Sequence, residues 1–210
     1  MASTKDPVNQ ANFLLRYALQ SFGLVLLLAV LIRIFLLSSY VMSGSAMLPS
    51  IWPGDFLVAA KWRVRELRRG DIVALRCPSG KDKLCLKRVV AVPGDRVEFR
   101  DGVLVVNGQL AAHRKQGVFE TESVADNAWA IWPESSKGLN REPVVVPPQA
   151  IYLLNDKRSD HEDSRNWGPV SDDMLEGRVL RVWMSLDWYE GDRVRSWPRI
   201  RWARLLRGID

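Results

Sequence analysis

The residues from 13 to 40 form an apolar stretch that strongly limits how this chain can fold. Charge interrupts the stretch only at Arg16 and Arg33, and the segment from Tyr17 to Ile32 carries none. A helix rises about 1.5 Å per residue, so roughly 20 such residues cross a hydrocarbon core of about 30 Å. Arg33 lies near one end, where a long side chain can reach the membrane interface. The sequence therefore predicts one transmembrane anchor at residues 13–40.

A cleaved secretory signal is the alternative interpretation of this stretch. Such signals have an apolar region of about 7–15 residues and a cleavage site made of small residues. The stretch here is longer, and Ser38-Ser39-Tyr40-Val41 is a poor cleavage site, so we expect an uncleaved anchor. Lys5 and Arg16 lie on its N-terminal side and favour a cytoplasmic location for that side. The expected topology is a short cytoplasmic N-terminus at residues 1–12 and an extracytoplasmic domain at residues 41–210.

The chain carries a net charge of +6, and two short segments each carry a net charge of +4. Residues 61–70 contain five basic residues and one acidic residue, and residues 191–210 contain six arginines and two aspartates. The second segment also contains Trp197 and Trp202. Basic side chains mixed with tryptophan suit an anionic, amphipathic interface, so we expect a membrane-proximal tail that contacts anionic lipids. Charge alone fits a nucleic-acid partner, but an anchored domain outside the cytoplasm disfavours one.

The residues after the apolar stretch suffice for one globular domain, and 47% of the whole chain is apolar. Short runs rich in branched residues alternate with Gly-Asp and Asn-Gly turn signals, which predicts a mainly β domain. Residues 111–148 are polar and irregular in pattern, so we expect an inserted cap there. The predicted strands are 72–75, 86–92, 96–99, 103–106, 151–154 and 179–184, and the Gly-Asp turns begin at Gly54, Gly70 and Gly94.

Cys77 and Cys85 are the only cysteines in the chain. Pro78-Ser79-Gly80 between them is typical of a turn, so the two residues can face each other across a hairpin and form a disulfide in an oxidising compartment. Two ordinary half-buried thiols fit the pattern equally well, and the sequence leaves both alternatives open. His113 and His161 are isolated, and no group of residues has metal-ligand spacing, so we expect no metal and no cofactor.

Three polar clusters lie in the β domain, and the first of them is rich in serine. It has no histidine beside it and no paired carboxylates, so the base for a hydroxyl nucleophile would be a lysine. Lys87, in the second cluster, lies on a predicted strand; taken alone, it would be an ordinary exposed charge, but its neighbouring motifs favour the base. A lysine with its usual pKa of about 10.4 is almost fully protonated at pH 7, so this role requires burial. The clusters are residues 43–50, 87–95 and 155–170.

In this order, behind an N-terminal anchor, the clusters resemble type I signal peptidase, a family of membrane-bound Ser-Lys endopeptidases. The resemblance covers residues 41–183 and is most specific at Lys87 with Pro93-Gly94-Asp95 and at Asp163-Ser164-Arg165-x-Trp167-Gly168. It implies a signal-peptidase-like β domain, held at the inner (plasma) membrane by a single helix with the catalytic domain on the extracytoplasmic side. It also implies a monomer that binds the signal peptides of exported preproteins and removes them after Ala-x-Ala.

One departure from the family concerns the nucleophile. The first family box reads Ser-Met-x-Pro-Thr/Ser, and its serine attacks the substrate. Here Met47-Leu48-Pro49-Ser50 puts Ala46 at that position, and the spacing to Gly54-Asp55 matches without a gap. Ser45 as nucleophile would need an inserted residue, and a shift of one residue turns a side chain to the opposite face of an extended chain. We therefore expect Ala46 in place of the serine, and a chain that is catalytically inactive as written.

The resemblance assigns roles to further residues. Lys87 would be the general base, and the backbone N–H of Ala46, with Gly44 and Ser45, would support the oxyanion. Pockets that admit only small side chains would explain Ala-x-Ala selection by exclusion. The residues expected to line these pockets are Met42, Ile51 and Leu86. The charged residues expected to form an ion-pair scaffold are Asp156, Arg158, Asp163 and Arg165.

Two other departures lie in the third cluster. A serine that often supports the lysine in this family aligns with His161, and Asn155 replaces the usual glycine. The supporting role is therefore not transferred to His161. Two alternative functions stay open beside the housekeeping enzyme: a specialised peptidase that matures pilins or conjugation proteins, and a pseudopeptidase that binds signal peptides without cutting them.

Overall fold

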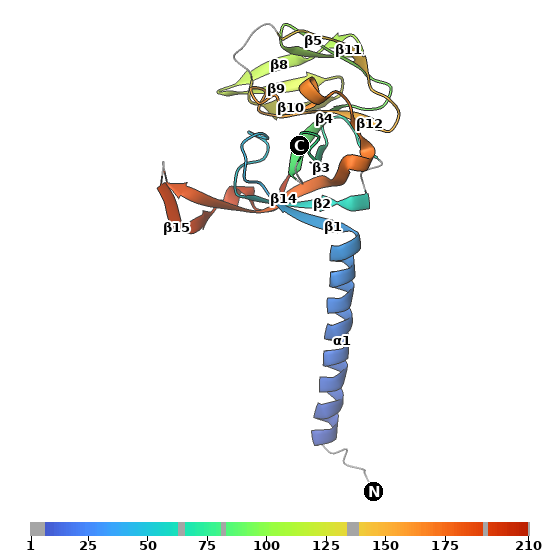
Figure 1. Ribbon diagram of the computed structural model, residues 1–210. Coiled ribbons are helices and arrows are strands. Elements are labelled where there is room, and N and C mark those ends of the chain that lie inside the picture. The colour runs from blue at the N-terminus through green and yellow to red at the C-terminus, as the bar shows by residue number, and fades with distance from the viewer. Residues whose placement is uncertain (1–6, 63–65, 81–82, 134–138, 191–192, 210) are drawn as a thin grey trace. The chain divides into compact units, whose positions relative to one another are not determined.

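The computed structural model describes residues 7–62, 66–80, 83–133, 139–190 and 193–209 (Figure 1). The chain divides into two compact units, of which the first ends at Leu37 and the second begins at Ser38. Parts of the predicted N-terminal segment, basic segment, cap and tail lie outside the described residues, at 1–6 (including Lys5), 63–65, 134–138, 191–192 and 210.

Helix α1 (Pro7–Phe35) is the described part of the first unit, and it contains most of the apolar stretch. Its segment Arg16–Arg33 has a mean hydropathy of 1.5 and no buried residues, so the helix is long and apolar enough to cross a membrane. The helix ends before the predicted boundary at residue 40, because Leu37–Val41 forms strand β1. Serine is a poor helix former, and tyrosine and valine favour strands, which explains the early end at Ser38-Ser39-Tyr40-Val41.

The second unit is mainly β, which confirms the predicted fold class. Its largest sheet has the order β1-β2-β14-β3-β4-β12-β13, and the long strand β14 also pairs with β15 and β16. Each predicted strand overlaps an observed one. The strands of this sheet are β1, β2 (Asp55–Ala60), β3 (Ile72–Arg76), β4 (Leu84–Ala91), β12 (Ala150–Leu154), β13 (Val170–Ser171), β14 (Leu175–Glu190), β15 (Arg193–Ile200) and β16 (Arg207–Gly208).

Two smaller antiparallel sheets lie beside the β4–β12 end of the large sheet (Figure 1). One has the order β11-β5-β6-β7 and the other the order β10-β9-β8. Their strands are β5 (Arg96–Arg100), β6 (Val103–Val106), β7 (Gln109–Leu110), β8 (Ala112–Gln116), β9 (Phe119–Val124), β10 (Asn127–Ile131) and β11 (Arg141–Val145). The short helices are α2 (Ser164–Trp167) and the 3₁₀ turns η2 (Asp172–Met174) and η3 (Trp202–Arg204).

The inserted cap expected at residues 111–148 stays a prediction, and the region is more regular than its sequence pattern indicates. Most of the described part of this region is strand: β8, β9 and β10 form a sheet of their own, and β11 pairs with β5, which precedes the predicted cap. Val124, Trp129 and Ile131 are buried in the same apolar cluster as Phe99 of β5. A few alternate side chains thus supply enough apolar contact to order strands whose other residues are polar.

Strand β12 is buried on both faces and forms the centre of the core. Ile151 and Leu153 pack in a cluster with residues of β3 and β4, whereas Tyr152 and Leu154 pack toward the smaller sheets, in the cluster that contains Trp129. Successive side chains of a strand point to opposite faces, so one apolar strand serves both clusters. Full burial of each such side chain contributes about 1.5–3 kcal/mol. The end of β12 is thereby held rigidly, and the third polar cluster begins there.

The C-terminal segment, expected to be a membrane-proximal tail, pairs with the large sheet in its described part. Its strands β15 and β16 pair with β14, and Arg204 is buried in an ion pair with Asp55 of β2. A fully buried aspartate needs a counter-charge, which explains why this arginine turns inward. Trp197 and Trp202 remain 85% and 71% exposed, so the outer face of the segment is still amphipathic.

Candidate active site

Lys87 is buried on strand β4, in the middle of the large sheet. In the sheet it lies opposite Val73 of β3, and only 3% of the residue is exposed. The next residue, Arg88, is fully buried as well. Because adjacent side chains on a strand point to opposite faces, the two cations occupy different environments. Lys87 is therefore not the exposed strand charge that a single lysine would suggest.

A cavity of about 690 Å³ lies beside Lys87. One wall is the segment from Ser39 to Ala46, which contains the end of β1 and the start of the serine-rich cluster. The hairpin of β3 and β4 forms another, and Asp160 and Glu162 of the third cluster also line the cavity. Lys87 and Ala46 thus share one cavity, although they are far apart in the sequence.

The surroundings of Lys87 lower the pKa of its amine. Burial is the largest cause, since it removes water from the charged form, and the Arg165 guanidinium acts in the same direction. The carboxylates of Asp163, Asp160 and Glu162 oppose it and raise the pKa. The net direction is downward, so a larger share of the amine is neutral near pH 7 than in an ordinary lysine.

Two residues contact the Lys87 amine directly. Its Nζ atom donates a hydrogen bond of 2.7 Å to Oδ1 of Asn155, and it lies 5.4 Å from the centre of the Trp167 ring. Asn155 follows the last residue of β12, and Trp167 ends helix α2, so both contacts come from the third polar cluster. The amine is therefore held between β4 and this cluster.

The serine-rich cluster is fixed at its centre, at Ala46 and Met47. Met47 is fully buried with Ile51 and Leu57 in an apolar cluster against β2 and β14. The backbone carbonyl of Ala46 accepts a hydrogen bond of 2.9 Å from the N–H of Lys157, in the third cluster. Burial on one side and this bond on the other hold Ala46 at the cavity wall.

The residues predicted to support an oxyanion or bind substrate do not all reach the cavity. Gly44 and Ser45 line it beside Ala46, and so do Met42 and Leu86. Ile51 is fully buried in the apolar cluster below and is not among the described residues of the cavity wall. Ile51 is a branched apolar residue on the inner side of its turn, so its position in the core agrees with its chemistry.

The predicted charged residues form buried ion pairs: Asp163 pairs with Arg165 as a predicted partner, whereas Asp156 and Arg158 pair with residues outside the predicted set. Asp156 accepts hydrogen bonds of 2.7 and 2.8 Å from Arg88, which also donates to Ser50 Oγ (2.8 Å). These bonds join β4, the third cluster and the serine-rich cluster. A pair with both members fully buried is strongly destabilised when one partner is lost, so Asp156 has a structural role here.

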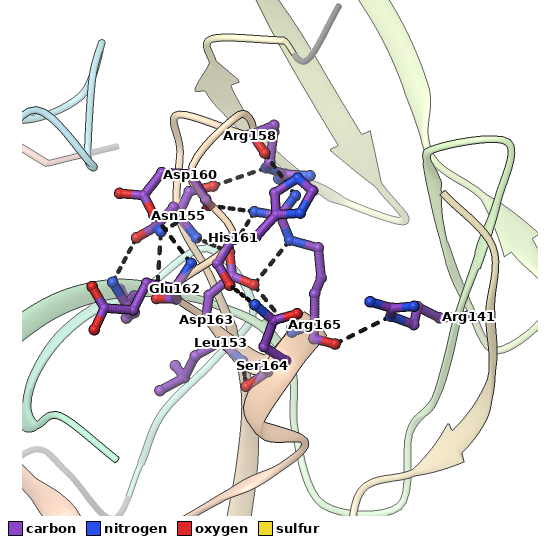
Figure 2. A network of polar contacts seen from close by, with 12 residues as sticks. Arg141, Leu153, Asn155, Arg158, Asp160, His161, Glu162, Asp163, Ser164 and Arg165 are labelled. Carbon is purple, nitrogen blue, oxygen red and sulfur yellow. Dashed lines mark hydrogen bonds and ion pairs between the residues drawn. The ribbon is translucent and has the colours of Figure 1, made fainter. Parts of the chain in front are cut away.

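Asp163 and Arg165 organise the loop of the third cluster (Figure 2). Asp163 caps helix α2 by accepting from the Arg165 N–H, and its other oxygen accepts from the Asn155 N–H at 3.0 Å. The Arg165 guanidinium donates to Asp163 and to the backbone carbonyls of Arg158 and Asp160. An arginine that donates to several carbonyls of one loop restricts that loop to one shape.

Arg158 pairs with Glu122, a residue that the sequence analysis missed. Arg158 Nη1 lies 2.9 Å from Glu122 Oε1, and Trp129 Nε1 and His113 also contact the Glu122 carboxylate. Burial alone would raise the pKa of Glu122, but the charges and hydrogen bonds of Arg158 and His113 lower it to about 2. Glu122 lies in an alternating polar strand with no motif around it, so only the folded structure identifies its role.

Cys77 and Cys85 form a disulfide across the β3–β4 hairpin, which decides between the two alternatives left by the sequence. Both residues line the cavity, and Ser79 in the turn donates a hydrogen bond of 2.5 Å to Glu162 on the loop of the third cluster. The hairpin and the loop are therefore connected at the cavity. Elsewhere in the described residues, no three His, Cys, Asp or Glu side chains converge on a common metal position.

Comparison with known proteins places this arrangement in a family. A family model described as signal peptidase, peptidase S26, matches residues 15–184. The match covers most of the chain, so the chain belongs to the signal peptidase family, and the resemblance to type I signal peptidase is confirmed.

Relatives from distant bacteria support the same assignment. The chain is 27% identical to signal peptidase I of Pseudomonas fluorescens, over 86% of this chain and 76% of the relative. It is 31% identical to signal peptidase I of Bacillus caldolyticus, over 72% of this chain and 82% of the relative. A crystal structure of a signal peptidase I from Enterococcus faecalis V583 matches with 24% identity and a TM-score of 0.36, covering 54% of this chain and 96% of that one.

Proposed function

We propose that this chain is a membrane-anchored signal peptidase scaffold whose lysine base is intact and whose nucleophile is replaced by Ala46. The observation that carries the proposal is the shared cavity, in which the buried Lys87, with its lowered pKa, lies with the segment from Gly44 to Ala46. A lysine in this state is suited to take a proton from a hydroxyl group, and Ala46 offers none.

With a serine at position 46, the chemistry would run in two steps. The neutral Lys87 amine takes the proton of the serine hydroxyl as its oxygen attacks the scissile carbonyl, and the resulting ammonium then protonates the leaving amine as the C–N bond breaks. In the second step the neutral Lys87 amine takes a proton from water as the water attacks the acyl ester, and the resulting ammonium protonates the serine oxygen as the ester C–O bond breaks. The residue 46 N–H, with Gly44 and Ser45 nearby, would stabilise the oxyanion.

The choice of position 46 over Ser45 as the nucleophile position rests on the contacts that hold Ala46 and Met47 in place. Met47 is fully buried and the Ala46 carbonyl is bonded to Lys157, so the frame of this segment is fixed. Ser45 lies in the bend before Ala46 and lines the same cavity, so the frame relative to Met47, and not the alternation of a strand, favours position 46. Loss of the attacking oxygen reduces the rate by a factor of about 10⁶ in a comparable serine hydrolase.

The substrate would be a signal peptide that binds in extended form along the cavity. Met42 and Leu86 line the cavity and contact the apolar cluster beneath it, where Ile51 lies. Apolar walls of this kind admit small side chains and exclude large ones, which matches Ala-x-Ala selection. Ile51 would act from behind the wall by supporting it.

The proposed location is the plasma membrane, with α1 as a single transmembrane helix and the β domain outside the cytoplasm. The disulfide between Cys77 and Cys85 favours this side, because disulfides persist in oxidising compartments. The exposed Trp197 and Trp202, among arginines, would contact anionic lipids at the membrane surface.

The non-catalytic alternative has one observation in its favour, which is Ala46 itself. A pseudopeptidase would bind a precursor with Ala-x-Ala at its cleavage site and never cut it. Replacement of Ala46 by serine (Ala46→Ser) separates the two: restored cleavage identifies a peptidase scaffold, and continued binding without cleavage identifies a dedicated binder. Cleavage by the unmodified chain that is lost with Ser45→Ala would show that position 45 is the nucleophile.

A further inference from the structure

We propose that Asn155 is the positioning residue for the Lys87 amine, holding it toward the cavity through a neutral hydrogen-bond acceptor. This inference rests on the proposed function, in which Lys87 is the base. Neither the position of Asn155 after β12 nor its amide chemistry would suggest this role by itself.

The contact is buried and short. Asn155 is 0% exposed, and its Oδ1 atom lies 2.7 Å from Lys87 Nζ. In the described part of the chain, this oxygen is the acceptor of the Lys87 amine's hydrogen bond. The Trp167 ring covers the amine at 5.4 Å but accepts no conventional hydrogen bond. The direction of the amine therefore depends on Asn155.

The Asn155 amide can take only one orientation. Its Nδ2 atom donates to the carbonyl of Asp160 at 3.0 Å and lies 3.5 Å from the carbonyl of Glu162 (Figure 2). Carbonyl oxygens accept and do not donate, so the amide nitrogen must face this loop and the amide oxygen must face Lys87. A flipped amide would set its oxygen against two carbonyl oxygens and its nitrogen against the Lys87 amine.

The backbone of Asn155 is fixed as firmly as its side chain. Its N–H donates to Asp163 Oδ2 at 3.0 Å, and its carbonyl accepts from Arg158 Nε at 2.9 Å. Every polar group of the residue thus has a partner, and such a fully bonded network is rigid. The acceptor that Lys87 meets is consequently preset before any substrate binds.

The neutrality of the Asn155 oxygen matters because charged side chains already surround the Lys87 amine and shift its pKa in opposite directions. Asp160, Glu162 and Asp163 face the amine from the third cluster and raise its pKa, whereas Arg165 and burial lower it. A further carboxylate at 2.7 Å would favour the ammonium form strongly. An amide accepts one hydrogen from the amine without adding a negative charge, which leaves the lone pair available on the cavity side.

The first test measures Lys87 directly and needs no catalysis. Carbon-13 NMR of the lysine Cε atoms of the full chain in micelles gives the pKa of Lys87, identified by the signal lost in Lys87→Arg. We expect Asn155→Asp, which keeps the shape of the side chain, to raise this pKa by at least about one unit, a tenfold change in the protonation equilibrium. An unchanged pKa in Asn155→Asp would overturn the proposal.

A matched control comes from the same loop. Asn166 donates from Nδ2 to the carbonyl of His161 at 2.8 Å and has no contact with Lys87. Asn166→Leu removes an amide that holds the loop, as Asn155→Leu does, but leaves the lysine acceptor in place. We expect the pKa of Lys87 to stay within about 0.3 units in Asn166→Leu. An equal shift of the Lys87 pKa in Asn166→Leu and Asn155→Leu would mean that loop structure, and not the acceptor, sets the pKa.

The second test uses Ala46→Ser as the active reference. Asn155→Leu in this background should lower kcat at least tenfold with KM changed less than about twofold, because positioning of the base acts on the chemical step. Asn155→Asp should move the acid limb of kcat/KM to higher pH. Full activity of a folded Asn155→Leu would overturn the proposal, and if that variant does not fold, the Asn155→Asp titration decides. Inactivity of Ala46→Ser with the expected NMR shifts would instead reject the proposed function alone.

Discussion

At the scale of single residues, the electrostatic balance around Lys87 determines the pH at which it can act. Because burial lowers the pKa of Lys87, kcat/KM of Ala46→Ser should rise with pH through a value below the 10.5 of an ordinary lysine. Glu162 raises this pKa, so Glu162→Gln should move the rise to still lower pH. Glutamine keeps an acceptor for Ser79, which makes the change mainly one of charge. A pH profile measured on both variants checks the sign, and a shift to higher pH would contradict it.

The buried pair of Glu122 and Arg158 gives a prediction about stability. Glu122→Gln leaves the Arg158 charge buried and uncompensated, and loss of one partner of such a pair costs about 3–5 kcal/mol. The folded pKa of Glu122 is about 2 against an ordinary 4.5, so its contribution is complete above the ordinary value and is lost as the pH falls toward 2. Denaturant unfolding should show a large difference between parent and variant at neutral pH and a smaller one at about pH 3. A constant difference would contradict this assignment.

The residues that could be predicted from the sequence are those that lie in motifs. Lys87, Asp163 and Arg165 stand at fixed distances from glycines and tryptophans, and their surroundings are therefore recognisable. Glu122 and the acceptor role of Asn155 were not predictable, because their importance comes from partners far away in the chain. The pocket role expected for Ile51 illustrates the opposite problem, since an apolar residue near a site can face the core.

At the scale of elements, the Gly-Asp turns connect strands that must approach closely. Gly54 has a φ of +88°, and a Cβ atom there would lie 2.0 Å from the carbonyl oxygen of Leu186 on β14. Gly94 has the same φ of +88° but open space around it, which makes it a matched control. Gly94→Ala should cost about 1–2 kcal/mol from backbone conformation alone, and Gly54→Ala clearly more, because β2 and β14 must separate. Equal unfolding free energies in the two variants would contradict the close approach.

The hairpin of β3 and β4 is closed by its disulfide. A cross-link over a loop of this length stabilises a protein by about 2–3 kcal/mol in the chain-entropy model. Cys77→Ser with Cys85→Ser should lower the unfolding free energy by this amount. It should also raise KM of Ala46→Ser, because both cysteines line the cavity. If the double variant is destabilised but its KM is unchanged, the disulfide has only a structural role.

The elements were predictable where their pattern is local. The strands around 103–106 and 151–154 appear at nearly the expected bounds, since branched apolar residues and flanking turns define them. The strands within residues 111–148 were not predicted, because they are mostly polar outside a few buried positions. The early end of α1 at Phe35 was hidden by apolar residues that continue into β1.

At the scale of the whole molecule, the chain combines an apolar helix with a β domain that carries the candidate site. The proposed topology puts the domain outside the cytoplasm and residues 1–12 inside. Protease added to intact spheroplasts should therefore digest the β domain and spare an N-terminal epitope tag. A protected domain with a digested tag would reverse the topology. The sequence alone predicted both parts, but neither the sidedness nor the disulfide follows from composition.

The most direct measurement is cleavage of a precursor with Ala-x-Ala at its processing site by the purified full chain in detergent. Ala46→Ser should produce the mature protein with its new N-terminus directly after the second alanine, as read by mass spectrometry. The unmodified chain and the double variant Ala46→Ser with Lys87→Ala should leave the precursor intact. Cleavage that persists without Lys87, or a folded Ala46→Ser protein that binds the precursor and never cuts it, would contradict a lysine base paired with position 46.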